Sequence, residues 1–166
     1  AVAGVTSNPA IFYNAIRTDP AYQTAVATLK GSAQDAERRF ENLVLPDVQK
    51  ACDLFLPLYE ASSGRAGLVS FEVSPALAGE QRATVQAAQR LWSEIARPNA
   101  MIKIPATPAG ISAVRECIAD GINGNVTLIF SRAQLAAVQT AYREGMERRR
   151  QAGQSVGRIA SVASVF

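Results

Sequence analysis

Short apolar segments that read as β-strands alternate with longer helical segments along this chain of 166 residues. This alternation predicts βαβ units, in which parallel strands pair side by side and the connecting helices pack on the sheet. The chain is therefore predicted to be an α/β protein built on a parallel sheet. Five strands are expected, at residues 2–7, 67–73, 100–107, 125–130 and 157–166.

The predicted helices connect these strands. Pro46 and Pro57 fall inside the longest helix and are expected to bend or divide it. Ser131 and Gln134 form a capping box at the start of the last helix. Helices are expected at residues 10–17, 19–31, from 32 or 34 to 62, 79–96, 108–120 and 131–150.

Two parallel-sheet architectures compete for this pattern. An open, doubly wound sheet would place a glycine-rich phosphate loop after its first strand, and the sequence has neither G-x-G-x-x-G nor a Walker A loop. A (β/α)8 TIM barrel needs on the order of 250 residues, or roughly 30 for each unit. At that rate the chain holds about five of the eight units. We therefore predict a single domain over residues 1–166 that is part of a TIM barrel.

Lys103 stands inside the apolar strand Ala100–Thr107. Lysine is almost never fully buried without a partner. Burial penalises the ammonium form, and a neutral amine can attack a carbonyl carbon and form a Schiff base. The alternative is a lysine that reaches water or pairs with a carboxylate. This strand alone leaves both interpretations open.

Every predicted strand carries polar side chains, most of them near its carboxyl end. Because side chains alternate along a strand, residues two apart share a face of the sheet. Barrels and open α/β sheets place their active sites at the carboxyl ends of the strands. If these polar side chains served only the stability of the fold, each set would need its own buried hydrogen-bond partner. Because several such sets converge on one end of the sheet, we predict a catalytic site there. The sets that share a face are Thr6 with Asn8, Ser70 with Glu72, Met101 with Lys103, Asn125 with Thr127 and Ile129, and Ser164 with Phe166.

These residue types suit the class I aldolase reaction on a sugar. Because the chain has no histidine, carboxylates, lysine, tyrosine or water must carry the acid–base steps. Lys103 is the candidate nucleophile toward a ketone, and Glu72 can move protons through a water held by Thr127. A Lys103–Glu72 salt bridge is the structural alternative, although a buried pair adds little net stability. The side chains suited to hydrogen-bond the hydroxyls of a polyol are Asn8, Asn125 and Ser164.

Composition argues against other classes of function. The net charge of +3 is small, and the basic run at 148–150 ends a predicted helix without the aromatic platform of a nucleic-acid site. No apolar run reaches the roughly 18–20 residues that span a membrane, and we identify no signal peptide. Cys52 and Cys117 lack metal-ligand spacing, so reduced cytosolic thiols are expected. We expect no nucleic-acid partner, no membrane partner and a cytoplasmic location.

Four motifs, in the order in which they occur along the chain, resemble those of transaldolases. Residues 4–12 (GVTSNPAIF) resemble the T-[ST]-N-P strand end of that family, and residues 69–73 (VSFEV) are similar to its S-x-E-V strand. Residues 102–107 (IKIPAT) resemble the strand that carries the Schiff-base lysine, and residues 124–131 (GNVTLIFS) resemble N-[VL]-T-L-x-F-S. Together the motifs run from end to end of the chain.

The resemblance implies a cytosolic enzyme of the non-oxidative pentose phosphate pathway that needs no metal and no organic cofactor. It would transfer a dihydroxyacetone unit from sedoheptulose 7-phosphate or fructose 6-phosphate to erythrose 4-phosphate or glyceraldehyde 3-phosphate. By motif match, Lys103 would form the Schiff base, and Glu72 and Thr127 would position the catalytic water. Sugar phosphates are the expected ligands, and a homodimer is left open. The residues expected to line the substrate site are Thr6, Asn8, Asn125, Ser164 and Phe166.

The chain also departs from the family pattern. It begins after the family's first strand, whose aspartate takes part in proton transfer, and it stops before the arginine that binds the substrate phosphate. The five strands are therefore expected to be roughly strands 2 to 6 of a barrel, and activity is expected of the parent protein. Alternatives are a fructose-6-phosphate aldolase, a transaldolase fused to a sugar-phosphate isomerase, and a non-catalytic partial barrel that serves as an interaction module.

Overall fold

A computed structural model of the protein describes residues 2–166, and its five strands form one parallel sheet. Each strand pairs with the next along the chain, so every connection moves the chain in the same direction across the sheet. A doubly wound sheet reverses that direction at a switch point, whereas the wall of a barrel does not. The sheet is therefore part of a barrel, which confirms the predicted fold class. The strands are β1 (Gly4–Thr6), β2 (Leu68–Glu72), β3 (Ala100–Pro105), β4 (Gly124–Ile129) and β5 (Ser161–Val165).

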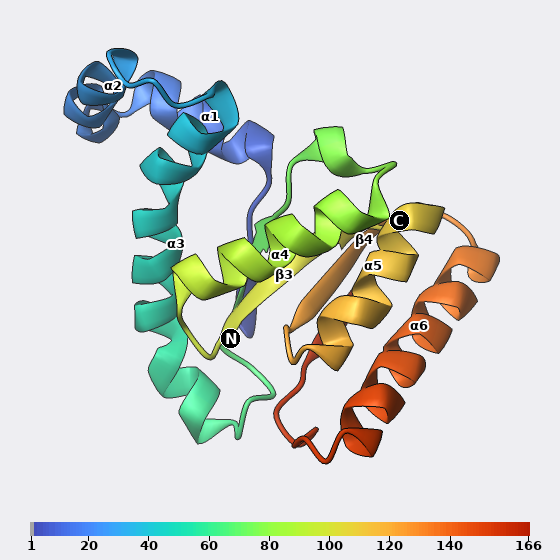
Figure 1. The fold of residues 1–166 in the computed structure, drawn as a ribbon. Coiled ribbons are helices and arrows are strands. Elements are labelled where there is room, and N and C mark those ends of the chain that lie inside the picture. The colour runs from blue at the N-terminus through green and yellow to red at the C-terminus, as the bar shows by residue number, and fades with distance from the viewer. Residues whose placement is uncertain (1) are drawn as a thin grey trace.

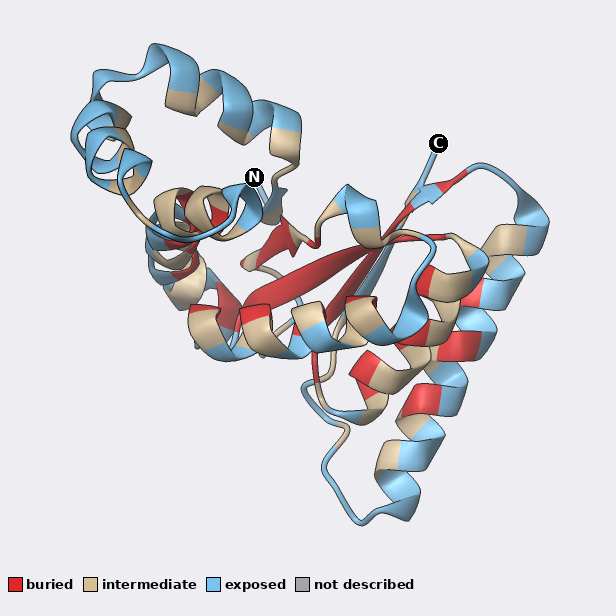
Figure 2. Cartoon of the chain, turned by 45° about the horizontal axis from the view of Figure 1, so that its top comes forward, coloured by how far each residue is buried: buried red, intermediate tan, exposed pale blue. Residues whose placement is uncertain are grey.

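Four helices cover one face of this sheet, namely α3 (Ala36–Ala61), α4 (Gln81–Ile95), α5 (Pro108–Ala119) and α6 (Arg132–Gln151). The other helical segments are α1 (Pro9–Thr18), η1 (Pro20–Tyr22), α2 (Gln23–Lys30) and η2 (Pro75–Leu77). Helices α4 and α5 lie in front of β3 and β4, with α3 and α6 on either side of them (Figure 1). Helices α1 and α2 form an arm that projects beyond the sheet and contains no buried residue (Figure 2).

The hydrophobic core lies between the sheet and these helices. The strand residues that face the helices are apolar and almost fully buried, and the central strands are buried along their length (Figure 2). Because side chains alternate along a strand, this packing leaves the other face of the sheet for the polar residues. The core residues on the strands include Val69, Phe71, Ile102, Ile104 and Val126.

The long helix α3 continues past both of its prolines. Pro46 and Pro57, which were expected to bend or divide the helix, lie inside it, and of these two outcomes division is contradicted. A proline removes one helical hydrogen bond and crowds the carbonyl four residues before it. Both prolines are on the exposed side of the helix, where water can reach the carbonyls that lose their partner.

Other helix boundaries differ from the predictions by a few residues. The helix expected over residues 19–31 is divided into η1 and α2. Helix α3 begins later than Ser32 or Gln34, because the side chain of Asp35 accepts a hydrogen bond from the Arg38 amide at 2.7 Å and caps it there. The Ser131 cap of α6 is confirmed by a 3.1 Å hydrogen bond from the Gln134 amide. No helix within residues 2–166 is long and apolar enough to cross a membrane.

A β-bulge interrupts β4 after Thr127. The pairing with β5 shifts register between Val126 and Ile129, and Leu128 has a positive φ of 60°. The extra residue turns Ile129 to the helix side, where it is fully buried in the core. The prediction that Ile129 shares a face with Asn125 and Thr127 was therefore wrong.

Candidate functional site

Lys103 and Glu72 meet at the carboxyl ends of two neighbouring strands. The register pairs Glu72 of β2 with Lys103 of β3, so both side chains point to the face opposite the helices. Lys103 is 9% exposed, and its Nζ lies 3.0 Å from Oε2 of Glu72. The same Nζ donates to the backbone carbonyl of Ser7 at 3.3 Å. The structure therefore brings together the predicted nucleophile and the predicted acid–base group.

The turn after β1 is held in place by Ser7. Its amide and its hydroxyl both donate to the carbonyl of Ser70 on β2, at 3.2 and 2.9 Å. These two bonds fix the peptide of Ser7 against the neighbouring strand, so that its carbonyl faces Lys103. Strand β1 thus takes part in the site through a backbone atom, which residue-type patterns do not indicate.

A second polar cluster crosses the sheet beside the lysine. Asn125 of β4 pairs in register with Lys103 and is 4% exposed. Its Nδ2 donates to Oγ of Ser70 at 3.0 Å, and its Oδ1 accepts from Oγ of Ser164 at 3.0 Å. Side chains therefore connect three strands, β2, β4 and β5, on the face of the sheet opposite the helices, which we call the inner face.

An open hollow of about 300 Å³ lies on this inner face. Its polar lining comes from Thr6, Arg65, Ser70, Asn125 and Ser164, and Lys103 and Glu72 lie outside it. The apolar residues that line it are Ala3, Gly4, Val5, Leu68, Met101 and Val162. Thr6 is exposed at its margin. The hollow is large enough for several water molecules or part of a small polar ligand.

Thr127 lies two residues beyond Asn125 on the same strand and is 2% exposed. Its hydroxyl makes no hydrogen bond to any residue in the range 2–166, and it is not among the fully buried atoms without a partner, so a small molecule can reach it. A water or substrate oxygen would satisfy it, which is the role expected from the sequence.

Two predicted site residues have other contacts. Asn8 is the N-cap of α1, where its Oδ1 accepts from the amide of Ile11 at 2.9 Å. Its Nδ2 makes no hydrogen bond within the described chain, so the side chain has one group left for a ligand. Phe166 is 71% exposed and packs on Phe130 with ring centroids 5.5 Å apart. Neither residue contacts Lys103 through a hydrogen bond in residues 2–166.

Sequence reasoning missed two members of the site. The carbonyl of Ser7 has no signal in a residue-type pattern. Ser70 shared a face with Glu72 in the predicted alternation, but its contact with Asn125 passes over β3 and could not be expected from neighbouring strands alone. The signal that could have found it is the layered packing inside a barrel, in which side chains from alternate strands meet.

The described residues offer no evident metal site. Residues 2–166 hold no group of three or more His, Cys, Asp or Glu side chains placed to bind a metal ion. Cys52 and Cys117 are free thiols buried in the core, and burial raises the pKa of the Cys52 thiol to about 11 and that of the Cys117 thiol to about 12. The expectation of a cofactor-free site stays a prediction.

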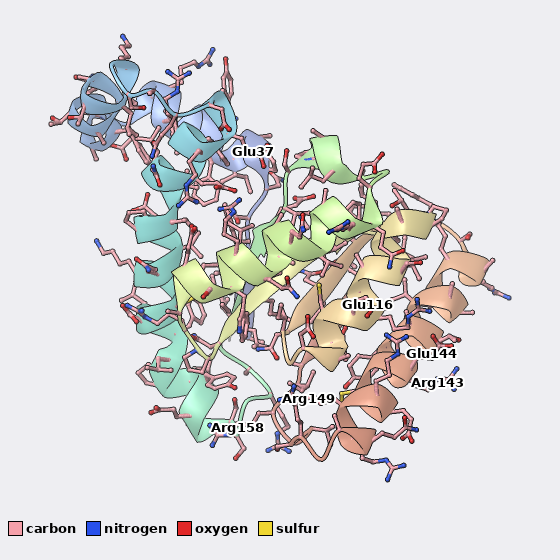
Figure 3. The ribbon with its side chains drawn as sticks, viewed as in Figure 1. Glu37, Glu116, Arg143, Glu144, Arg149 and Arg158 are labelled. Atoms are coloured by element: carbon pink, nitrogen blue, oxygen red, sulfur yellow. The ribbon has the colours of Figure 1, made fainter. Side chains whose placement is uncertain are left out.

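The basic run at the end of α6 is paired within the chain. Arg148 contacts Glu116 of α5 at 2.8 Å, and Arg150 contacts Glu147 at 2.7 Å. Figure 3 shows Glu116 on α5 and Arg149 at the end of α6, on the helical side of the sheet. Arg149 donates to the side chain of Gln154 at 2.6 Å and to two backbone carbonyls. The expected absence of a nucleic-acid partner is not tested by these contacts and stays a prediction.

The sequence of the chain is similar to known proteins along its whole length. Residues 1–166 match the family described as transaldolase/fructose-6-phosphate aldolase. Transaldolases of Thiobacillus denitrificans and Neisseria gonorrhoeae are 50% and 49% identical to the chain over 165 residues. A transaldolase of Mycobacterium bovis is 46% identical over 165 residues. These matches cover 99% of the chain and 46%, 47% and 44% of the three relatives. The chain thus spans about half the length of the curated relatives it matches.

Proposed function

Because the chain belongs to the transaldolase/fructose-6-phosphate aldolase family, we propose that the protein it represents is a transaldolase. It transfers a dihydroxyacetone unit from a ketose phosphate, sedoheptulose 7-phosphate or fructose 6-phosphate, to an aldose phosphate, erythrose 4-phosphate or glyceraldehyde 3-phosphate. This is a step of the non-oxidative pentose phosphate pathway, and the expected location is the cytoplasm. The names of the relatives favour transfer over the release of free dihydroxyacetone, which is the activity of a fructose-6-phosphate aldolase.

The contact between Lys103 and Glu72 is the observation that carries this proposal. An amine can attack a ketone only after it has lost its proton. Glu72 is the carboxylate within hydrogen-bond distance of Lys103 Nζ, at 3.0 Å, and is placed to receive that proton. A purely structural pair would gain little from burial, because the cost of removing both charges from water offsets their attraction.

The reaction follows from these two groups and a water. The Lys103 amine adds to C2 of the ketose, and loss of water leaves a Schiff base. The bond between C3 and C4 then breaks, its electron pair moves into an enamine on Lys103, and the proton of the C4 hydroxyl passes to a water beside Glu72. The aldose product leaves. The enamine carbon attacks the aldehyde of the acceptor, whose oxygen takes up a proton, and hydrolysis of the new Schiff base frees the lysine.

The surrounding polar groups suit the remaining roles. We assign to the hydroxyl of Thr127, which has no hydrogen-bond partner within residues 2–166, the role of holding the water that Glu72 uses. Hydroxyls of the sugar chain would bond to side chains that line the hollow or stand at its margin, and a site of this kind rejects analogues that lack those hydroxyls. The substrate-binding residues in this proposal are Thr6, Asn8, Asn125, Ser164 and Phe166.

Borohydride trapping tests the proposal. The full-length protein, as its gene encodes it, is incubated with fructose 6-phosphate and reduced, and the modified peptide is identified by mass spectrometry. We expect a three-carbon adduct on Lys103. The Lys103→Ala variant should form none, whereas Lys50→Ala, which removes an exposed lysine, should trap as the wild type does.

Two outcomes would contradict the proposal. Trapping that persists in Lys103→Ala would move the Schiff base to another lysine. An absence of adduct in the wild type would leave the Lys103–Glu72 contact as a structural salt bridge. Addition of erythrose 4-phosphate separates the two family activities, because a transaldolase then passes the three-carbon unit to the acceptor, while an aldolase releases dihydroxyacetone without one.

A further inference from the structure

Ser70 of β2 is 4% exposed and lines the hollow on the inner face. Its hydroxyl accepts from Nδ2 of Asn125 at 3.0 Å, and its carbonyl accepts twice from Ser7. The side chain of Ser70 is thus bonded to the Asn125 cluster, and its backbone carbonyl is bonded to the turn that faces Lys103.

The Ser70–Asn125 bond passes over the strand between them. Ser70 pairs in register with Met101 on β3, and Asn125 pairs with Lys103 on the same strand. Met101 is 1% exposed. Side chains from alternate strands of a barrel meet in layers in its interior, and Ser70 and Asn125 belong to one such layer. Asn125 also pairs in register with Lys103.

The carboxamide of Asn125 is held at both ends. Ser70 occupies one hydrogen of Nδ2 and Ser164 occupies one lone pair of Oδ1. One N–H and one lone pair remain free, and the two serines fix the plane in which these point into the hollow. An amide held by Ser164 alone could rotate about its side-chain bonds and lose that direction.

We infer that Ser70 is a positioning residue, which orients the carboxamide of Asn125 for a hydroxyl of the bound sugar. The inference rests on the proposed function, because it assigns Asn125 to the sugar site. Ser70 acts through Asn125 and does not itself take part in the proton transfers. Its hydroxyl makes no hydrogen bond to Lys103 or Glu72 in the described chain.

A double-mutant cycle on the full-length protein tests this role. Ser70→Ala should lower kcat/KM for fructose 6-phosphate by roughly 3- to 10-fold, mainly through a higher KM, as expected for the loss of one positioning hydrogen bond. In the Asn125→Ala background, where there is no amide left to orient, Ser70→Ala should change kcat/KM less than about twofold. Borohydride trapping on Lys103 at saturating fructose 6-phosphate should stay at the wild-type extent.

The matched control is Ser161→Ala, the same substitution on the same sheet. Ser161 pairs with Gly124, lies on the opposite face of β5 from Ser164 and is exposed, so its loss should leave kcat/KM unchanged. If Ser70→Ala does not fold, Ser70→Cys fills the same space with a weak hydrogen-bonding group and should show the same coupling to Asn125→Ala.

Fully additive losses in the double variant, or no loss in Ser70→Ala, would overturn the inference while leaving the proposed function intact. A purely structural Ser70 would reduce trapping, kcat and thermal stability together. An absence of trapping and transfer in the wild type would overturn the proposed function, and the inference with it. The wild-type measurement therefore distinguishes the two failures.

Discussion

Glu72 is the residue whose role can be separated most sharply from structure. Glu72→Gln keeps the shape of the side chain and removes the charge that lies 3.0 Å from Lys103 Nζ. Because glutamine cannot accept a proton from the lysine or from the water, we expect turnover to fall by about 10²- to 10⁴-fold, the usual range for a lost acid–base group. Steady-state kcat, measured with donor and acceptor at saturation, checks this.

The folding control for Glu72→Gln is its thermal unfolding midpoint, which should fall, because removing one partner of a buried ion pair leaves the charge of Lys103 without compensation. Turnover of the variant and of the wild type is therefore compared at a temperature well below both midpoints. The substitution should also slow the trapping of Lys103, since the amine loses its nearest proton acceptor. Unchanged turnover with an unchanged trapping rate would mean that Glu72 serves only as the ion-pair partner of Lys103.

Individual residues show where sequence reasoning succeeds. The alternation of side chains predicted that Lys103, Glu72, Asn125 and Ser164 share one face, and these residues do lie together there. The rule failed at Ile129, because the bulge at Leu128 adds one residue to β4 and reverses the alternation beyond it. A bulge depends on the register with a neighbouring strand, which a pattern within one strand does not contain.

At the scale of elements, one glycine sets the distance between α5 and the end of the lysine strand. A Cβ at Gly110 would lie 2.0 Å from the carbonyl oxygen of Pro105, a backbone atom that cannot move without shifting β3. Gly110→Ala should therefore lower the free energy of unfolding by about 1–3 kcal/mol, the usual cost of overpacking. Urea denaturation measures the change.

Gly79→Ala is the matched control for that substitution. Nothing lies within 4 Å of a Cβ at Gly79, which also has no positive φ, so its effect should stay within about 0.5 kcal/mol. Because the clash is with the residue that follows Ile104, Gly110→Ala should also weaken trapping on Lys103. Equal stabilities of the two variants would show that α5 can move away from β3 at no cost.

The elements themselves were predictable, while several of their ends were not. All five predicted strands are present, although β5 begins at Ser161 and not at residue 157, and the single helix expected over residues 19–31 is divided into η1 and α2. The start of α3 was misplaced because Ser32, Gln34 and Asp35 are all plausible caps, and only Asp35 bonds to an amide three residues ahead. The continuity of α3 through Pro46 and Pro57 depends on which side of the helix meets solvent, and that is a property of the packed molecule.

At the scale of the whole molecule, one face of the sheet serves stability and the other carries the candidate site. The helical face carries the apolar core, and the opposite face carries the lysine, the carboxylate and the amide cluster. Sequential strand order produces this division, since every helix returns on the same side. The exposed apolar side chains of β1 and β5, among them Val5, Val162 and Val165, lie at the two edges of the sheet.

The two cysteines report on whether the helical layer opens as one unit. Cys52 of α3 and Cys117 of α5 belong to the same core, and each is at most 1% exposed. Burial raises the thiol pKa from its ordinary value of 9.0 to about 11 for Cys52 and to about 12 for Cys117. Since each folded-state pKa is raised, the stability that these thiols contribute is fully present below pH 9 and is lost as pH rises through 11 to 12.

At pH 7.5, a value chosen well below the thiol pKa values, neither cysteine should react with iodoacetamide in the native protein, because the thiolate is scarce and the sulfur is covered. In mild urea both should be alkylated at the same rate, since one cooperative opening of the shared core exposes both. Peptide mass spectrometry over time measures the two rates separately. Faster modification of Cys52 would show that α3, which carries the projecting arm, detaches before the α5 layer, and the single core would then have to be described as two.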